Sequence, residues 1–167
     1  MENLYLFFVL ALGFLAIADL IVGVSNDAVN FLSSAIGSKA VSFKKIMIIA
    51  SFGIALGAIF SSGMMEVARK GIFNPELYYF DEIMIIFLAV MITDILLLDF
   101  FNTLGLPTST TVSIVFELLG AAVSIAAYKI WENSQSINEL ITYINYSKAT
   151  QIIPVSYTHL TLPTTQV

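Results

Sequence analysis

The chain has 167 residues, of which 58% are hydrophobic and 11% are charged, and its mean hydropathy is +0.90. Soluble domains carry about 25% charged residues, so this composition excludes an ordinary soluble domain and is typical of a membrane protein. The net charge of −5 argues against a nucleic-acid partner, and the absence of cysteine excludes disulfides and thiolate metal sites. We therefore expect an all-α integral membrane protein.

Four apolar segments follow one another along the chain, at residues 4–22, 46–65, 83–98 and 112–130. A helix needs roughly 20 mostly apolar residues to cross a bilayer. The first two segments meet this length, whereas the last two are short or polar enough to be re-entrant instead. Gly53 and Gly57 in the second segment have the GxxxG spacing that lets two membrane helices pack closely, which leaves a homo-oligomer open.

The first polar interruption, GVSNDAVNFLSSAIGSKA at residues 23–40, follows the first apolar segment. We expect it to break the first helix. Asn26 and Asn30 are one helical turn apart and offer amide donors to an anion. Asp27 can accept a hydrogen bond from a protonated phosphate, or it can hold a cation that the anion then contacts.

The second polar interruption, FFNTLGLPTSTTV at residues 100–112, lies between two apolar segments and carries no charge. A water-exposed loop usually carries more charge, so we expect a re-entrant helical hairpin whose turn is surrounded by protein or lines a cavity. The hydroxyls of Ser109, Thr110 and Thr111 gather at the start of its second arm, where free N–H groups and the helix dipole favour an anion. Helix capping alone is the simpler interpretation of either interruption, but two interruptions beside uncompensated acids indicate a transporter site.

Charged side chains at membrane depth are costly and are therefore candidates for function. Five acidic residues lie in or beside the apolar segments: Asp19, Asp27, Asp94, Asp99 and Glu117. The only basic residue among them is Lys129, at the end of one segment. Carboxylates without basic partners can bind a cation or a proton, which indicates a cation-coupled transporter or a cation channel.

The composition changes after Ile130. We expect residues 1–131 to form the transmembrane unit and the polar residues 132–153 to lie outside the membrane. The final stretch, residues 154–167, resembles translated sequencing-adapter sequence. We expect this stretch, with the only histidine, His159, to be a non-native tail that makes few contacts with the helices.

The two interruptions together resemble the signature regions of the N-terminal half of the inorganic phosphate transporter (PiT) family, and the resemblance covers about residues 4–130. Its first signature contains the spacing N-D-x-x-N, which Asn26, Asp27 and Asn30 keep. Its second signature, G-x-P-x-S-T-T, is matched by Gly105, Pro107, Ser109, Thr110 and Thr111. Two positions depart from the family, because Val112 stands where a histidine often follows and Glu117 where a small or apolar residue is usual.

The resemblance implies one half of an inverted-repeat transporter, with a broken first helix and a re-entrant hairpin. It also implies a set of phosphate-binding residues: Asn26, Asp27, Asn30, Ser109, Thr110 and Thr111. Asp27 and Asn30 are then the candidate ligands for a coupling Na⁺. Each signature occurs once, so we expect a truncated fragment that lacks the second half of its binding site.

These observations predict a transporter of the bacterial plasma membrane that takes up inorganic phosphate together with Na⁺ or H⁺ and uses no cofactor besides this ion. Sulfate or another tetrahedral oxyanion is the alternative substrate. A non-transporting structural membrane subunit is the alternative from a different class. An enzyme is not expected, because no nucleophile is paired with a base.

Overall fold

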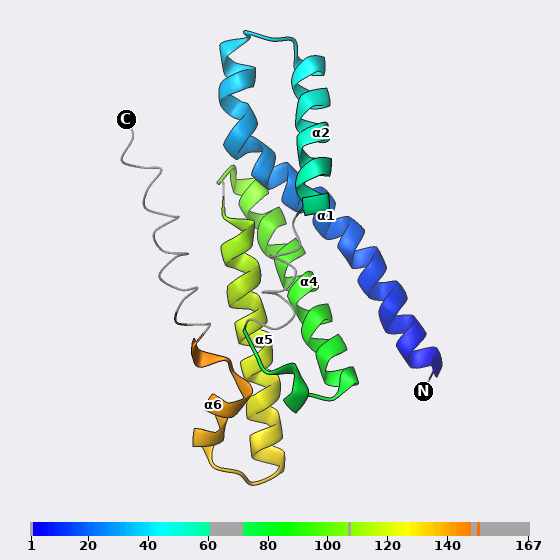
Figure 1. Cartoon of the computed structure of the whole chain (residues 1–167), viewed down its shortest axis with the longest axis vertical. Helices are drawn as coiled ribbons and strands as arrows, with labels where there is room; N and C mark the ends of the chain where they lie inside the picture. Colours follow the sequence, from blue (N-terminus) through cyan, green and yellow to red (C-terminus); the bar gives the residue numbers. More distant parts are fainter. Residues whose placement is uncertain (1, 61–71, 107, 148–149, 151–167) are drawn as a thin grey trace.

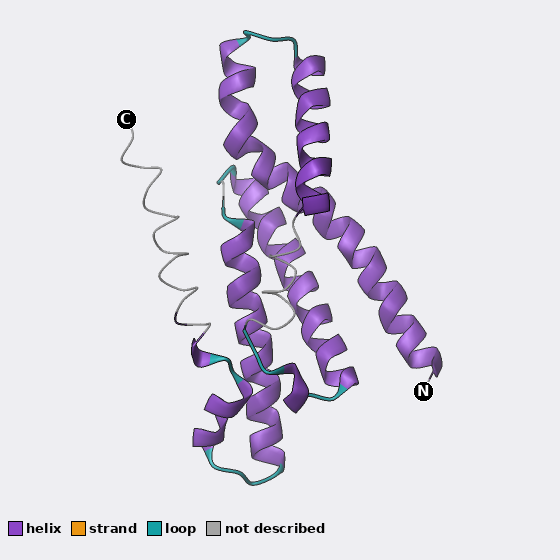
Figure 2. Cartoon of the chain, viewed as in Figure 1, coloured by secondary structure: helices purple, strands orange, loops and turns teal. Residues whose placement is uncertain are grey.

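The computed structural model describes residues 2–60, 72–106, 108–147 and 150. Four long helices dominate this part of the chain: α1 (Glu2–Ser38), α2 (Phe43–Phe60), α4 (Phe80–Leu104) and α5 (Thr110–Glu132). Two 3-10 helices, η1 (Pro75–Leu77) and η2 (Ile137–Glu139), and a single helical turn, α6 (Leu140–Tyr143), complete it, and these described residues contain no strand (Figure 2). All four long helices are long and apolar enough to cross a membrane. The predicted all-α membrane architecture is therefore confirmed.

The first helix is not broken, contrary to the prediction. α1 is continuous over 37 residues and includes residues 23–38 of the polar interruption. Figure 1 shows it changing direction near its middle. The polar interruption begins with Gly23, and the Ser25 hydroxyl donates to the Ile21 carbonyl at 2.7 Å. Small residues and such serine back-bonds bend helices without opening them. With no proline between residues 23 and 40, nothing forces the backbone to leave the helix.

α4 and α5 form an antiparallel hairpin whose turn begins at Gly105. This glycine has a φ of 68°, the left-handed conformation that ends helices, and its N–H donates to the Asn102 carbonyl at 3.1 Å. The arms have 25 and 23 residues, longer than the apolar segments at 83–98 and 112–130, because both helices continue into their polar flanks. Re-entry of this hairpin into the membrane stays a prediction.

α4 packs between α1 and α5 (Figure 1). The contact with α5 is made by residues four apart, which lie on one face of each helix. Ile86 and Val90 of α4 and Leu118, Ala122 and Ala126 of α5 are buried there. The alanines let the two helices approach closely, as small residues do in membrane bundles.

The end of the hairpin that lies away from its turn is covered by residues 72–79, which precede the hairpin in the chain, and residues 137–146, which follow it. Phe73 and Ile144 form an isolated antiparallel bridge, and the Asn74 N–H donates to the Tyr143 carbonyl at 2.9 Å. Lys129 of α5 connects these covering segments to the hairpin by donating to the Leu77 carbonyl. The turn of the hairpin lies at the opposite end, against α1.

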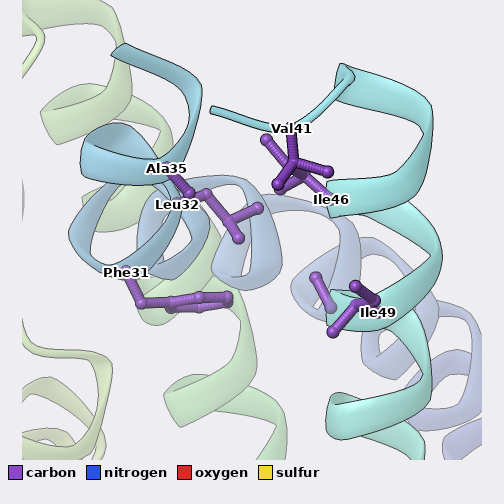
Figure 3. Close-up of a pocket in the computed structure, with 7 residues that line it drawn as sticks. Phe31, Leu32, Ala35, Val41, Ile46 and Ile49 are labelled. Atoms are coloured by element: carbon purple, nitrogen blue, oxygen red, sulfur yellow. The ribbon is translucent and has the colours of Figure 1, made fainter. Parts of the chain in front are cut away.

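α2 lies beside the C-terminal part of α1 (Figure 1). Between the two helices is a pocket of about 330 Å³, with Phe31 and Leu32 of α1 facing Ile46 and Ile49 of α2 (Figure 3). All its lining side chains are apolar, so it offers no donor to an anion. The predicted tail at residues 154–167, including His159, lies outside the described residues.

Candidate functional site

The two polar interruptions meet where the turn of the α4–α5 hairpin contacts the middle of α1. In Figure 1 the turn lies beside α1 well below the loop that leads to α2. Asn26 and Asp27 come from α1, and Thr108 and Thr110 come from the start of α5. Residues more than 80 positions apart are thus brought together.

Asn26 is the centre of this contact and is only 2% exposed. Its side-chain oxygen accepts the Thr108 backbone N–H at 3.1 Å. Its Nδ2 donates to Asn102 Oδ1 at 2.8 Å, and Asn102 Nδ2 in turn donates to the Val22 carbonyl at 3.3 Å. Because a buried amide is costly without partners, this chain of hydrogen bonds explains how an asparagine is accommodated among apolar helices.

Asp27 binds the first residue of α5. The Thr110 hydroxyl donates to its carboxylate at 3.1 Å to Oδ2 and 3.4 Å to Oδ1. The carboxylate therefore lies at the start of α5, where the helix dipole is positive and stabilises negative charge. Asp27 is partly exposed, unlike Asn26, so a ligand can approach it from one side.

The remaining predicted site residues divide into three cases. Ser109 is partly buried and precedes α5, but its side chain makes no capping hydrogen bond. Thr111 is exposed, so the structure does not bring it into the contact with Asn26 and Asp27. Asn30 lies one turn further along α1, and its side chain is outside the described part of the chain.

Asn102 and Thr108 belong to the contact but were not among the predicted site residues. The side chain of Asn102 bridges α4 and α1, a role that its place near the end of an apolar segment does not reveal. Thr108 acts through its backbone N–H, which no side-chain pattern reveals. Their position within the second polar interruption was the available signal.

Three of the five acids form a second polar cluster. Asp19, Asp94 and Glu117 come from α1, α4 and α5, and the Ser113 hydroxyl donates to Glu117 Oε1 at 2.7 Å. Asp99 is exposed and takes no part. Lys129 does not neutralise the cluster, because its ammonium is 2.9 Å from Glu82 at the far end of the hairpin.

No group of three His, Cys, Asp or Glu side chains in the described residues has a geometry that could hold a metal ion. The predicted Na⁺ ligands, Asp27 and Asn30, would need further oxygen ligands around them. Na⁺ binding by this pair stays a prediction.

Comparison with known sequences identifies the family of this chain. The sequence profile of the phosphate transporter family matches residues 23–163, which include both interruptions. The chain belongs to the phosphate transporter family. This is a family of transporters and not of enzymes, which agrees with the absence of a nucleophile and base. The matched stretch also includes residues 154–163 of the predicted tail.

Individual relatives of this phosphate transporter family chain carry consistent names. A Thermococcus kodakarensis protein named as a phosphate permease is 30% identical over 132 residues, covering 77% of this chain and 29% of that protein. A sodium-dependent phosphate transporter of Plasmodium falciparum is 35% identical over 118 residues, covering 68% of this chain and 18% of that protein. A Helicobacter pylori protein named as a phosphate permease is 35% identical over 104 residues, which are 61% of this chain and 20% of that protein. The chain spans less than a third of the length of each of these relatives, and no solved structure matches it.

Proposed function

We propose that this protein contributes half of a binding site for inorganic phosphate and takes part in phosphate uptake across the plasma membrane, in symport with Na⁺ or H⁺. The observation that carries the proposal is the meeting of Asn26 and Asp27 with Thr108 and Thr110 at the hairpin turn. Family membership and the names of the relatives support the substrate.

The contact contains both kinds of group that a phosphate needs. The Thr108 N–H and the Thr110 hydroxyl are donors at the positive end of α5, where an oxyanion is stabilised. The Asp27 carboxylate is an acceptor. Phosphate near neutral pH keeps a proton that it can donate to Asp27, whereas sulfate has none, so the acceptor favours phosphate over sulfate.

The negative charge of Asp27 also favours a coupling cation. Asp27 is partly exposed and has no basic partner in the described part of the chain, so a cation that binds with phosphate offsets the repulsion between carboxylate and anion. The name of the Plasmodium relative supports Na⁺. We propose that Asp27 and Asn30 contribute ligands to this ion.

The Asp27→Asn variant tests the proposal. The amide keeps the size of the side chain and one acceptor oxygen for the Thr110 hydroxyl, whereas the charge and the second acceptor oxygen are lost. Phosphate binding by the chain in lipid nanodiscs, and uptake by a longer form reconstituted in proteoliposomes, should fall more than tenfold. A hydrogen bond to a charged group contributes about 1.5–3 kcal/mol, and a loss of about 1.4 kcal/mol in binding free energy weakens affinity tenfold.

Asp99→Asn is the matched control, because Asp99 is an exposed acid outside the contact. Radiolabelled phosphate is measured with Na⁺ and pH gradients imposed separately and with sulfate as competitor. Near-normal, ion-driven uptake by Asp27→Asn contradicts the proposed role of the carboxylate. Equal competition by sulfate moves the substrate to the alternative oxyanion.

A further inference from the structure

Asp19, Asp94 and Glu117 form a second polar layer in the same three helices. Asp19 is seven residues before Asn26, and Glu117 is seven residues after Thr110. Asp94 is eight residues before Asn102 in α4. At about 1.5 Å per residue, this layer lies about 10 Å from the Asn26 contact along each helix.

The three acids have few hydrogen-bond donors around them, and the donor shown is the Ser113 hydroxyl, which donates to Glu117 Oε1 at 2.7 Å. Asp94 is only 2% exposed and interacts with both Asp19 and Glu117. One buried oxygen of each acid, namely Asp19 Oδ1, Asp94 Oδ1 and Glu117 Oε2, has no hydrogen-bond partner. Ionised carboxylates only accept hydrogen bonds, so contact between them is repulsive unless a proton lies between two oxygens.

Within residues 2–60, 72–106 and 108–147, no basic side chain is paired with this layer. In the described residues α1 contributes Asp19, and its next acid, Asp27, lies two turns away at the hairpin turn. α4 contributes Asp94, while Asp99 is exposed. α5 contributes Glu117, and its Lys129 is paired with Glu82. Asp94 is buried and Asp19 and Glu117 are partly buried, so ionising all three carboxyls together is costly.

We propose that Asp19, Asp94 and Glu117 form a proton-binding site, in which protons shared between the carboxyls supply the hydrogen bonds that their buried oxygens lack. Each bound proton removes one negative charge and converts one acceptor oxygen into a donor. A metal ion fits less well, because no group of three acidic side chains in the described residues has the geometry to hold one. The site is distinct from the proposed phosphate site and does not depend on it.

Infrared spectroscopy of the whole chain in lipid nanodiscs tests the proposal, because a protonated carboxyl has a carbonyl band separate from that of a carboxylate. The wild-type chain, without phosphate, should show this band at neutral pH and lose it only when the pH is raised. The isosteric variants Asp19→Asn, Asp94→Asn and Glu117→Gln should each weaken the band, and the triple variant should abolish it. Asp81→Asn should leave it unchanged, because Asp81 is exposed at the start of α4, away from the cluster on the same helix as Asp94.

The wild-type titration alone can overturn the proposal, so the result does not depend on whether the triple variant folds. Absence of the protonated band at neutral pH would falsify it. Loss of the band on addition of Na⁺ would show a sodium site in place of a proton site. A band that persists in a folded triple variant would place the proton elsewhere. None of these outcomes measures phosphate, so failure here is separate from failure of the proposed function.

Discussion

Asn26 connects the hairpin turn to α1 through both ends of its side-chain amide. The oxygen accepts from the Thr108 N–H and the nitrogen donates to Asn102. Replacement by an apolar residue of similar size leaves two partly buried groups without their partner, and an unsatisfied group costs about 1–3 kcal/mol.

We therefore expect Asn26→Leu to lower the free energy of unfolding by about 2–4 kcal/mol. Reversible unfolding in mixed micelles, followed by circular dichroism, measures the change. Asn138→Leu is the control, since Asn138 is exposed and should change stability by less than about 0.5 kcal/mol. Equal stability of the two variants would mean that the Asn26 hydrogen bonds do not hold the turn.

The sequence predicted part of this contact for a physical reason. Polar side chains at membrane depth face the interior of the bundle and pair with one another, because exposure to lipid is costly. Asn26 and Asp27 could therefore be expected to approach the hydroxyls of the second interruption. The sequence could not predict that Thr111 faces outward, because the start of α5 fixes which side of the helix each residue takes. The unassigned role of Asn102 shows the same limit.

Gly105 decides how α4 ends. Its φ of 68° is a conformation that residues with a side chain adopt only at a cost, although an added Cβ would contact nothing within 4 Å. The cost of Gly105→Ala is therefore purely one of backbone conformation, about 1–2 kcal/mol.

Gly57→Ala is the matched variant, because Gly57 lies within α2 and an added Cβ there also meets nothing within 4 Å. Alanine is favoured over glycine inside a helix by about 1 kcal/mol, so this variant should be neutral or stabilising. Unfolding of both variants by the same assay should give opposite signs. A stable Gly105→Ala chain would indicate that the hairpin turn tolerates another conformation.

Lys129 fastens the covering segments to the hairpin. Its ammonium is 2.9 Å from Glu82 Oε2 and from the Leu77 carbonyl, and it lies 4.6 Å from the centre of the Tyr79 ring. The side chains of Lys129 and Glu82 are 13% and 18% exposed, so the pair is more shielded than a surface ion pair.

We expect Lys129→Met, which keeps the length of the side chain, to lower stability by about 2 kcal/mol through loss of the ion pair and ring contacts. The loss should be local, so hydrogen exchange should accelerate at residues 72–79 and 137–146. Lys44→Met, at an exposed position of α2, should change neither. Unchanged exchange at the covering segments would assign their attachment to the apolar core alone.

The elements themselves were predictable to different degrees. The length of the apolar segments predicted the helices, because a helix needs about 20 mostly apolar residues to cross a bilayer. The continuity of α1 was not predictable from polarity, since Asn26 is satisfied by side-chain hydrogen bonds from another helix and not by an opened backbone. A break in a membrane helix and a buried polar contact between two continuous helices both place polar residues within an apolar segment, so the sequence alone does not distinguish them.

The bundle is taller than a bilayer core. α1 has 37 residues and is therefore about 56 Å long, against a hydrocarbon thickness of about 30 Å. The hairpin turn contacts Asn26, which is twelve residues before the end of α1, or about 18 Å below it. If the loop at residues 39–42 lies at the membrane surface, the turn lies near the middle of the membrane.

Cysteine labelling tests this placement, and the chain has no native cysteine to interfere. Leu106→Cys lies at the turn and is 50% exposed in the protein, so only lipid would protect it. We expect a bulky membrane-impermeant maleimide to leave it unlabelled in intact vesicles of either orientation, and to label it after detergent is added. Ser42→Cys should react from one side without detergent, and labelling of Leu106→Cys at the same rate would place the turn at the surface.

The hydrogen bonds that close the hairpin onto α1 have a consequence for occupancy. A donor serves one acceptor at a time, and the Thr108 N–H and Thr110 hydroxyl are already engaged by Asn26 and Asp27. A bound oxyanion that uses these donors must displace α1 from them, so the protein's own side chains act as a tethered competitor at high local concentration. Substitutions that loosen the turn but leave Asp27 and these donors in place would then tighten anion binding, since the two equilibria are reciprocal.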